Sequence, residues 1–329
     1  MTGNAFMTTV SIIICTCNRV ADLRQTLDAI GRLPVPAELS CELTVVDNGS
    51  SDGTAATVQS LTLPNMPLRY LSEPRRGKGY AYNAGMAAAT GDILLFTDDD
   101  VRPPADWLEG MSRPIASGEA DAVVGGVKLA PHLHRPWLKK EHVRPLASTE
   151  YLPHDVLINL VGANMAFSRR VLERVPQFDV ELGPGATGMG DETLFSQQLT
   201  AAGYRFALAL DIVAVHHLDP SRLTRKGFGA LIRKIGASNA YISWHWSHDG
   251  PKNAYWALTR AWLALWARRL RFFPAWVTSP TVPAWELQLL DTLYTKMYYL
   301  KERKRPRNYE KQGLVKLRGI SPGGPAPSE

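Results

Sequence analysis

The sequence lacks the features that mark several common classes of protein. Its three cysteines are an odd number without C-x-x-C spacing, which argues against a disulfide framework or a zinc site and favours a reduced, cytoplasmic compartment. The N-terminus has no basic region followed by an apolar run, so no secretory signal is expected. No run of about 18 uncharged apolar residues occurs, so no segment is predicted to span a membrane.

Two further absences narrow the function. No G-x-G-x-x-G follows the first predicted strand, which disfavours a dinucleotide-binding oxidoreductase. Acids are scarce between Arg222 and Arg271, where ten lysines or arginines accompany one acid, Asp249. A second basic run covers residues 301–307. This asymmetry predicts either an anionic partner or a solvated basic face. Since no recognised nucleic-acid module accompanies it, we expect no nucleic-acid partner.

Apolar runs alternate with helical periods over the first 130 residues. The runs typical of buried strands cover residues 10–17, 42–47, 68–71, 92–97 and 121–127. Helical patterns lie between them, at residues 23–30 and at the alanine-rich stretch 81–90. This alternation predicts an α/β domain with a mainly parallel, Rossmann-like sheet flanked by helices. In such sheets, ligands bind beyond the carboxyl ends of the strands.

Polar clusters follow three of these predicted strands. Residues 16–19, Asp47 and the triplet 98–100 are expected to meet at one edge of the sheet. Three adjacent aspartates repel one another unless a cation lies among them, and carboxylate oxygens suit Mg²⁺ or Mn²⁺. The alternative is an acidic helix N-terminus, because the helical stretch PPADWLEGM follows. The clustering at one edge favours a metal site.

Five segments stand in a fixed order along the chain. They are VSIIICTCNR, VVDNGSSDGT, RRGKGYAYNAG, ILLFTDDDVRP and FDVELGPGATGMGDETLFSQQLTAAGYRF. Together they resemble the family 2 glycosyltransferases of the GT-A fold, in the nucleotide-diphospho-sugar transferase superfamily, over residues 8–220. The resemblance implies an inverting, metal-dependent transfer of sugar from a nucleoside-diphosphate sugar, with a UDP-sugar expected. The acceptor would be a hydroxyl of a glycan or lipid-linked molecule, in polysaccharide or glycolipid assembly.

The resemblance also implies a metal site. In this family a D-x-D motif holds Mg²⁺ or Mn²⁺ against the diphosphate, which here points to Asp98 and Asp100, with Asp100 the expected direct ligand. A histidine after the last strand completes the site in related folds. Adjacent residues of a strand face opposite sides, so only one of His216 and His217 can serve, and we assign His216. The alternative is a purely structural histidine.

The nucleotide sugar is expected to lie along the same edge. The resemblance places Asp47 against the nucleoside, although an Asx-turn opening the loop that follows is an alternative role for it. Arg75, Arg76 and Lys78 offer cations to the phosphates, or form a solvated turn. The full set expected to contact the nucleotide sugar is Thr16, Asn18, Arg19, Asp47, Arg76, Lys78, Asn83, Asp98 and Asp99.

A second acidic pair, Asp191 and Glu192, is the candidate catalytic base. An inverting transfer needs a base to accept the proton of the acceptor hydroxyl. The family usually has Glu then Asp, with Asp as the base, whereas this sequence reverses them. Residue type therefore favours Asp191 and position favours Glu192; we lean to Asp191. The alternative is an acidic first helical turn. The glycines upstream, which suit a loop folding around a sugar or moving as a lid, are Gly183, Gly185, Gly188 and Gly190.

The C-terminal part is basic and rich in tryptophan. Seven of the nine tryptophans lie between Trp244 and Trp285, interleaved with arginines, and Trp262, Leu265, Trp266 and Leu270 fall near one helical face. This composition suits a helix at an anionic membrane surface, here the inner face, or helices packed on the catalytic domain or in a dimer.

The predicted organisation is a catalytic domain with a helical extension. The domain covers residues 8–220, divided into a nucleotide-sugar half, 8–130, and an acceptor half, 131–220. The extension covers 221–305, and a Pro/Gly-rich tail, 306–329, is expected to be disordered. Two other functions fit part of the pattern: a sugar-nucleotide nucleotidyltransferase, and an inactive membrane-associated protein that binds sugars or nucleotides.

Overall fold

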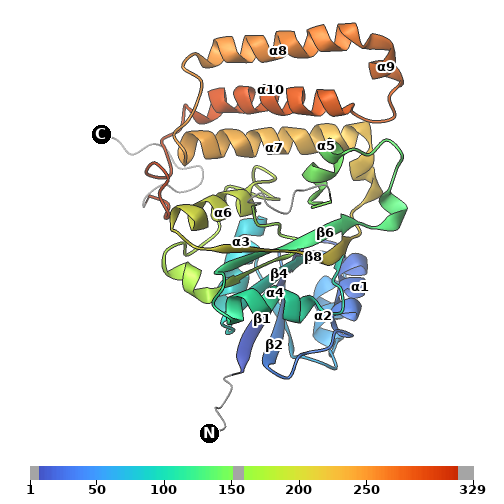
Figure 1. Cartoon of the computed structure of the whole chain (residues 1–329), viewed down its shortest axis with the longest axis vertical. Helices are drawn as coiled ribbons and strands as arrows, with labels where there is room; N and C mark the ends of the chain where they lie inside the picture. Colours follow the sequence, from blue (N-terminus) through green and yellow to red (C-terminus); the bar gives the residue numbers. More distant parts are fainter. Residues whose placement is uncertain (1–6, 151–158, 318–329) are drawn as a thin grey trace.

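The predicted α/β fold with a mainly parallel sheet is confirmed. The computed structural model describes residues 7–150 and 159–317, and within these ranges eight strands form one sheet in the order β3-β2-β1-β4-β7-β6-β8-β5 (Figure 1). The strands are β1 (Thr8–Thr16), β2 (Leu39–Asp47), β3 (Leu68–Ser72), β4 (Ile93–Asp98), β5 (Val101–Arg102), β6 (Ala122–Leu129), β7 (Met165–Ser168) and β8 (Phe206–His216). The helices are α1 (Val20–Ile30), α2 (Thr54–Ser60), α3 (Lys78–Ala88), α4 (Trp107–Ala116), α5 (Lys140–Val143), α6 (Asp191–Ala201), α7 (Arg225–His245), α8 (Ala254–Arg271), α9 (Phe273–Thr278) and α10 (Ala284–Glu302).

The sheet separates two hydrophobic cores because alternate side chains of a strand face opposite sides. Ile12 and Ile14 of β1 pack in one core with residues of α1, α2 and α4. Ile13, between them, faces the other core, where Tyr82 of α3 and Phe195 of α6 lie. Both faces of β1 are therefore covered, which explains its continuous apolar run.

Strand pairing sets which loops meet. β1 lies between β2 and β4 and is parallel to both, and β2 is also parallel to β3. The other half is mixed, since β7 is antiparallel to β4 and β6, while β8 is parallel to β6. The carboxyl ends of β1, β2 and β4 therefore share one edge of the sheet.

Three long helices extend the domain on one side (Figure 1). α7 packs on the catalytic part through Phe228 and Ile232, α10 packs on α7, and α8 packs on α10. Leu265 is buried in this layer, whereas Trp262, Trp266 and Leu270 are exposed, so the four do not share one face as the sequence grouping suggested. No helix in the described part of the chain is long and apolar enough to cross a membrane.

Candidate functional site

The polar residues that follow β1, β2 and β4 lie side by side. Thr16 of β1 is in register with Asp47 of β2, and Cys15 is in register with Asp98 of β4. The backbone N–H of Asn48 donates to the Thr16 carbonyl at 2.9 Å, which joins the first two loops. The edge predicted from the sequence is therefore built by parallel pairing.

Asp47 already has partners for both oxygens. Oδ1 accepts from the backbone N–H of Ser50 at 2.8 Å, which is the Asx-turn considered as an alternative, and Oδ2 accepts from the Tyr70 hydroxyl at 2.8 Å. Asn18, with φ of 54°, accepts from the Ser51 N–H at 2.7 Å and so holds the first loop against the second. These contacts shape the edge without any ligand.

The basic loop before α3 is fixed by Asn48. Its Nδ2 donates to the carbonyls of Glu73 (3.0 Å) and Arg75 (2.7 Å), and its Oδ1 accepts from the Gly77 N–H at 2.8 Å. Arg75 pairs with Glu73 at 2.7 Å near the surface, and Arg76 is exposed. Lys78 alone of the three cations is directed into the site, as described below.

Asn83 has a structural partner in this structure. Its amide donates to the Phe178 carbonyl at 3.0 Å and accepts from the Phe178 N–H at 2.8 Å. This pair of bonds ties α3 to the segment 178–190 that precedes the acidic pair. The contact holds two parts of the site together, and the contact of Asn83 with the nucleotide sugar stays a prediction.

The three adjacent aspartates have different surroundings. Asp99 is buried and accepts from Thr16 Oγ1 at 2.7 Å and from Arg19 Nη1 at 2.8 Å. Burial raises the pKa of Asp99 to about 7, although Arg19 opposes this rise. Arg19 Nη2 also donates to Asp100 Oδ2 at 2.7 Å, while Asp98 pairs with Lys78 at 2.9 Å. Two cationic side chains thus separate the carboxylates that the sequence places together.

Asp98, Asp100 and His216 are arranged as a divalent cation would require. One ligand atom from each lies within 4.8 Å of the others. Asp100 Oδ1 is buried without a hydrogen-bond partner among the described residues, and His216 Nε2 lies 3.3 Å from it. His216 Nδ1 donates to the Leu146 carbonyl at 3.2 Å, which leaves Nε2 free to ligate. Two carboxylate oxygens and an imidazole nitrogen gathered within this distance are donors that suit Mg²⁺ or Mn²⁺.

The charge around Asp100 also suits a cation. Burial opposes ionisation of Asp100, but the adjacent His216 and the Arg19 guanidinium hold its pKa well below the usual range. Asp100 therefore carries its negative charge in the folded protein, with Oδ2 engaged by Arg19 and Oδ1 available.

Glu192 faces the aspartates across Lys78. Lys78 Nζ lies 2.9 Å from Asp98 Oδ1 and 3.3 Å from Glu192 Oε1, and the Tyr82 hydroxyl lies 3.5 Å from the same Oε1. A Cβ on Gly162 would come within 2.2 Å of Glu192 Oε1 and 3.0 Å of Lys78 Nζ, so the absent side chain leaves room for both groups. Tyr82 lies within the quoted segment RRGKGYAYNAG, and Gly162 begins the segment GANMAF, which the resemblance places on the acceptor side. Neither residue was assigned a role of its own from the sequence.

Asp191 is enclosed beside Glu192. The residue is 1% exposed and its Oδ2 has no partner among the described residues, while the Glu192 side chain is 17% exposed. Burial raises the pKa of Asp191 well above the usual range, with Glu192 adding to the rise. Burial acts on Glu192 as well, but Lys78 brings its pKa below the usual value. The directions of these two shifts favour a proton on Asp191 and a charge on Glu192.

The glycine-rich loop adopts a conformation that requires glycine. All four of its glycines have positive φ, between 81° and 106°, where other residues are strained. A Cβ on Gly183 would also meet Asp191 Oδ2 at 2.7 Å, so the loop closes directly over that carboxyl. The loop encloses Asp191 and leaves Glu192 on the open side.

An open pocket adjoins the aspartates on the side of α1. It is lined by Asn18, Arg19, Asp22, Arg102, His132, His217 and Asp219, among others. His217 lies here, while His216 turns inward to Asp100, as alternation along a strand predicts. The pocket reaches the aspartates through Arg19, which bonds Asp99 and Asp100.

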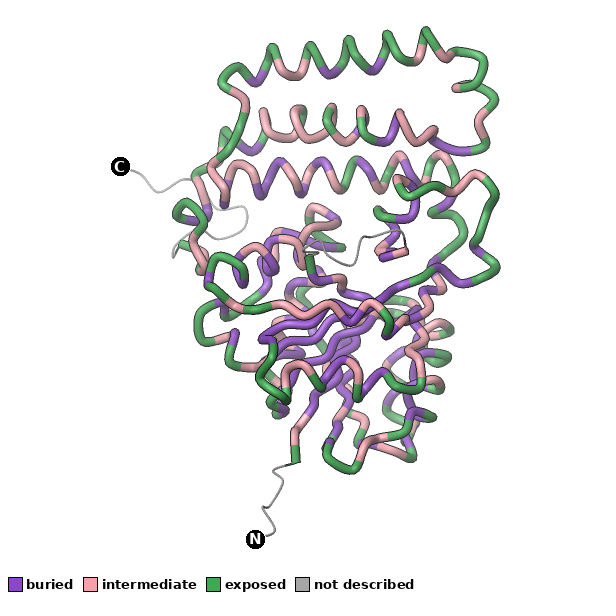
Figure 2. The backbone as a smooth tube through the Cα atoms, in the orientation of Figure 1, coloured by how far each residue is buried: buried purple, intermediate pink, exposed green. Residues whose placement is uncertain are grey.

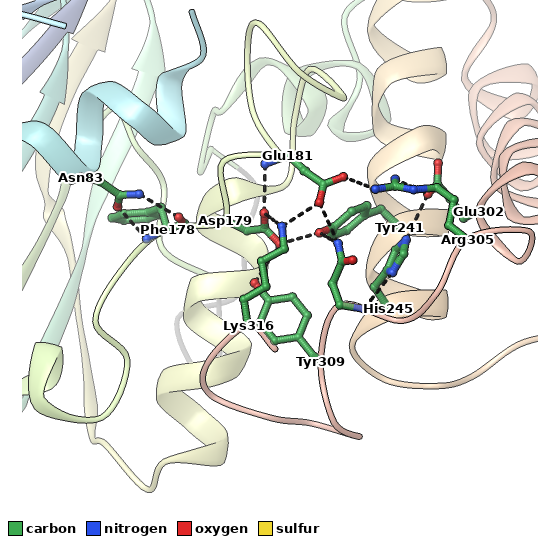
Figure 3. Close-up of polar contacts among 11 residues, drawn as sticks. Asn83, Phe178, Asp179, Glu181, Tyr241, His245, Glu302, Arg305, Tyr309 and Lys316 are labelled. Atoms are coloured by element: carbon green, nitrogen blue, oxygen red, sulfur yellow. Dashed lines mark hydrogen bonds and ion pairs between the residues drawn. The ribbon is translucent and has the colours of Figure 1, made fainter. Parts of the chain in front are cut away.

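A buried polar network anchors the segment before the acidic pair (Figure 3). Asp179 Oδ2 accepts from the hydroxyls of Tyr241 (2.6 Å) and Tyr309 (2.8 Å), and Asp179 Oδ1 accepts from Lys316 Nζ at 2.9 Å. Lys316 Nζ also donates to Glu181 Oε1 at 2.7 Å. The network continues through Arg305, which pairs with Glu181 and with Glu302, and ends at His245.

The tail contributes Tyr309 and Lys316 to this network. Residues 306–317 are packed against the catalytic domain, which the prediction of a disordered tail from residue 306 did not anticipate; residues 318–329 lie outside the described residues. Gln198 of α6 donates to the carbonyls of Gly313 and Leu314, both at 3.3 Å. The tail therefore supports α6, the helix that carries Glu192.

Lys316→Met is expected to lower stability by about 3 kcal/mol, because it leaves Asp179 and Glu181 buried with fewer cations. Despite burial, Lys316 and Arg305 hold the pKa of Glu181 below its usual 4.5, so this stabilisation is present above pH 4.5 and is lost as the pH falls through the depressed value. Urea unfolding midpoints measured against pH would report it. Lys311→Met, at an exposed position in the same tail, is the matched control. Equal losses in the two variants would contradict the assignment.

Comparisons with known proteins identify the family and support the fold. The model of the family described as Glycosyl transferase family 2 matches residues 11–175. Glycosyltransferase AglE of Haloferax volcanii is 28% identical over 233 residues, which cover 68% of this chain and 70% of that protein. Glucosyl-3-phosphoglycerate synthase of Mycobacterium tuberculosis is 30% identical over 208 residues, covering 53% of this chain and 59% of the relative. The structure of the mannosyltransferase PcManGT from Pyrobaculum calidifontis, in complex with GDP-Man and Mn²⁺, is similar with a TM-score of 0.58 at 23% identity, over 89% of this chain and 87% of that chain.

Proposed function

The chain belongs to glycosyl transferase family 2 and has the GT-A fold, and from this premise we propose that it is an inverting, metal-dependent glycosyltransferase. It moves a sugar from a nucleoside-diphosphate sugar to a hydroxyl acceptor, in polysaccharide or glycolipid assembly. The observation that carries the proposal is the charged cluster at the strand ends. There Asp98 and Asp100 gather with His216, and Glu192 faces them across Lys78.

Asp98, Asp100 and His216 would hold the divalent cation, Mg²⁺ or Mn²⁺. When bound, such a cation stabilises the negative charge that develops on the leaving diphosphate. Arg19 keeps Asp100 Oδ2 engaged and fixes the carboxylate, so that Oδ1 points away from the arginine. The open pocket beside α1 provides space for the rest of the nucleotide next to these residues.

Glu192 is the proposed base. It is ionised, it is the more exposed of the acidic pair, and Lys78 links it to the aspartates. Its Oε1 accepts the proton of the acceptor hydroxyl as that oxygen attacks the anomeric carbon from the face opposite the diphosphate. Asp191 is neutral and enclosed, and its role is to fill the space beneath the glycine-rich loop.

Different parts of the chain are assigned to the donor, to the acceptor and to the helical extension. We propose that residues 8–130 bind the nucleotide sugar, that residues 131–220 bind the acceptor, and that residues 221–305 form a helical extension. We propose uridine as the nucleoside of the donor sugar. Guanosine is the second candidate, because PcManGT was solved with GDP-Man. A glycan or lipid-linked molecule is the proposed acceptor.

Thermal unfolding with UDP, GDP, dTDP and UMP, each with and without Mn²⁺, tests the donor proposal. A ligand that binds only the native state at ~100 times its dissociation constant stabilises by about 2.7 kcal/mol. We expect one diphosphate to raise the midpoint by several degrees, only when the metal is present, and UMP to have less effect. An absence of any shift under every condition would contradict the proposal.

The anomeric configuration of the product tests inversion separately. A product that retains the configuration of the donor would contradict it.

A further inference from the structure

The outermost helix of the molecule has an unpartnered face. α8 contacts α10 along one side, and α10 separates it from α7 and the catalytic domain (Figure 1). Within α8 the buried residues are Ala254, Ala261 and Leu265, spaced by seven and four positions as one helical face requires. The rest of the helix is largely exposed in Figure 2.

Large apolar side chains gather on the exposed side of α8. Successive helical residues are about 100° apart, which places six of these side chains on one arc of roughly 120°, opposite the buried face. They are Tyr255, Trp256, Trp262, Leu263, Trp266 and Leu270. Their exposure reaches 62% for Tyr255 and 71% for Leu270, and α9 adds Phe273 and Val277. A stripe of this size is uncommon on the surface of an isolated soluble protein and marks an interaction surface.

The charge beside the stripe has one sign. Residues 254–278 contain four arginines and no acid. Arg269 is turned inward to Glu286 of α10. Arg260 and Arg271 are exposed along one border of the stripe, whereas Arg268 projects from the opposite side of the helix. No carboxylate of the described residues pairs with these three arginines. The surface is therefore both apolar and cationic.

We propose that the outer face of α8, continued by α9, docks on the surface of a membrane that contains anionic lipid. Tryptophan and tyrosine favour the depth of the lipid headgroups, and arginines on the same face attract lipid phosphates. A second copy of the chain is a poorer occupant, because it would bring Arg260 and Arg271 into contact with like charges. α8 lies on the membrane without crossing it, since no described helix is suited to span one. This surface is independent of the proposed reaction.

Co-sedimentation of the full chain with vesicles tests the proposal. One set of vesicles contains phosphatidylcholine alone, and the other contains equal parts of phosphatidylcholine and phosphatidylglycerol. We expect binding to the anionic set that weakens with salt. Each arginine that borders the stripe contributes about fivefold near an anionic surface, so Arg260→Gln and Arg271→Gln together should lower partitioning by about 25-fold.

A second variant tests the apolar stripe separately. Trp256→Ser, Trp262→Ser and Trp266→Ser together should lower partitioning on the order of 100-fold while leaving the unfolding midpoint near that of the native chain, because all three side chains are already exposed. The matched control replaces exposed arginines of the catalytic domain with glutamine, at Arg24 and Arg32.

Three results would overturn the proposal. They are no binding of the native chain to anionic vesicles at low salt, equal losses in the control, and a dimer in sedimentation velocity that the tryptophan changes abolish without any vesicle binding. The last would identify the stripe as a contact between two copies. Activity on a water-soluble acceptor should be unchanged in both variants, so a failure of docking is distinguishable from a failure of the proposed transfer.

Discussion

Glu192→Gln is expected to lower kcat by about 10²- to 10⁴-fold, because the amide cannot accept the proton of the acceptor hydroxyl. Glu192 is the ionised member of the acidic pair, with Lys78 Nζ at 3.3 Å. The amide has nearly the same shape, and Lys78 retains Asp98 as its partner, so folding and donor binding should persist. Steady-state kinetics, together with the midpoint shift caused by nucleoside diphosphate, separate loss of chemistry from loss of binding.

Asp191→Asn is the matched control one residue away. Asp191 is buried and neutral, so an amide of the same size replaces a carboxylic acid without removing a charge. We expect a small change in kcat. A loss larger than that of Glu192→Gln would assign the base to Asp191, as residue type alone suggested.

The pH profile distinguishes the two carboxyls independently. A base must be ionised, so kcat/KM falls as the pH drops through its pKa. The pKa of Glu192 lies below 4.5, so the profile should stay flat down to about that pH. If Asp191 were the base, its raised pKa would place the acid limb far higher. The measurement requires the native protein only, within the pH range where it remains folded.

The edge of the sheet was predictable because two simple patterns define it. Each apolar run stops where its buried strand ends, and parallel pairing then aligns those ends, as with Thr16 and Asp47. Alternation along the strand allows only one of His216 and His217 to face inward, and the resemblance to related folds suggested a histidine ligand at this place. Asp98, Asp100 and His216 were grouped from separate segments of the sequence, and in the structure they lie close together.

Orientation within a charged cluster was not predictable. Adjacent carboxylates give no indication that Asp99 turns toward Thr16 and Arg19 while Asp100 keeps an oxygen free. At the start of α6, one position changes the direction of a side chain by about 100°, which decides whether Asp191 or Glu192 is enclosed. The residue types at positions 191 and 192 do not indicate which of the two side chains faces the interior.

The tail shows a different limit of sequence reasoning. Its polar and glycine-containing composition predicts disorder, because such a segment cannot form a core by itself. Lys316 and Tyr309 instead find partners in Asp179, which lies more than a hundred positions earlier in the chain. In the sequence, nothing distinguishes Lys316 or Tyr309 from a solvent-exposed residue, because the partner Asp179 is distant along the chain.

Asp100→Asn is expected to abolish the metal-dependent response. Asp100 Oδ1 is the buried oxygen without a partner among the described residues, and the change removes the charge that would bind a cation beside His216. The midpoint shift with diphosphate and Mn²⁺ should disappear. The transfer rate should fall by about 10³-fold, because several kcal/mol of charge stabilisation on the leaving group are lost.

Asp99→Asn is the control for this experiment, since it changes the adjacent carboxyl in the same way. Both oxygens of Asp99 are engaged, by Thr16 and by Arg19, so we expect a lower unfolding midpoint with the Mn²⁺-dependent shift retained. The two variants therefore separate support of the fold from binding of the cation. If Asp100→Asn kept the full shift while Asp99→Asn lost it, the cation would be held by Asp99, and the arrangement of Asp98, Asp100 and His216 would be maintained by Arg19 and Lys78 alone.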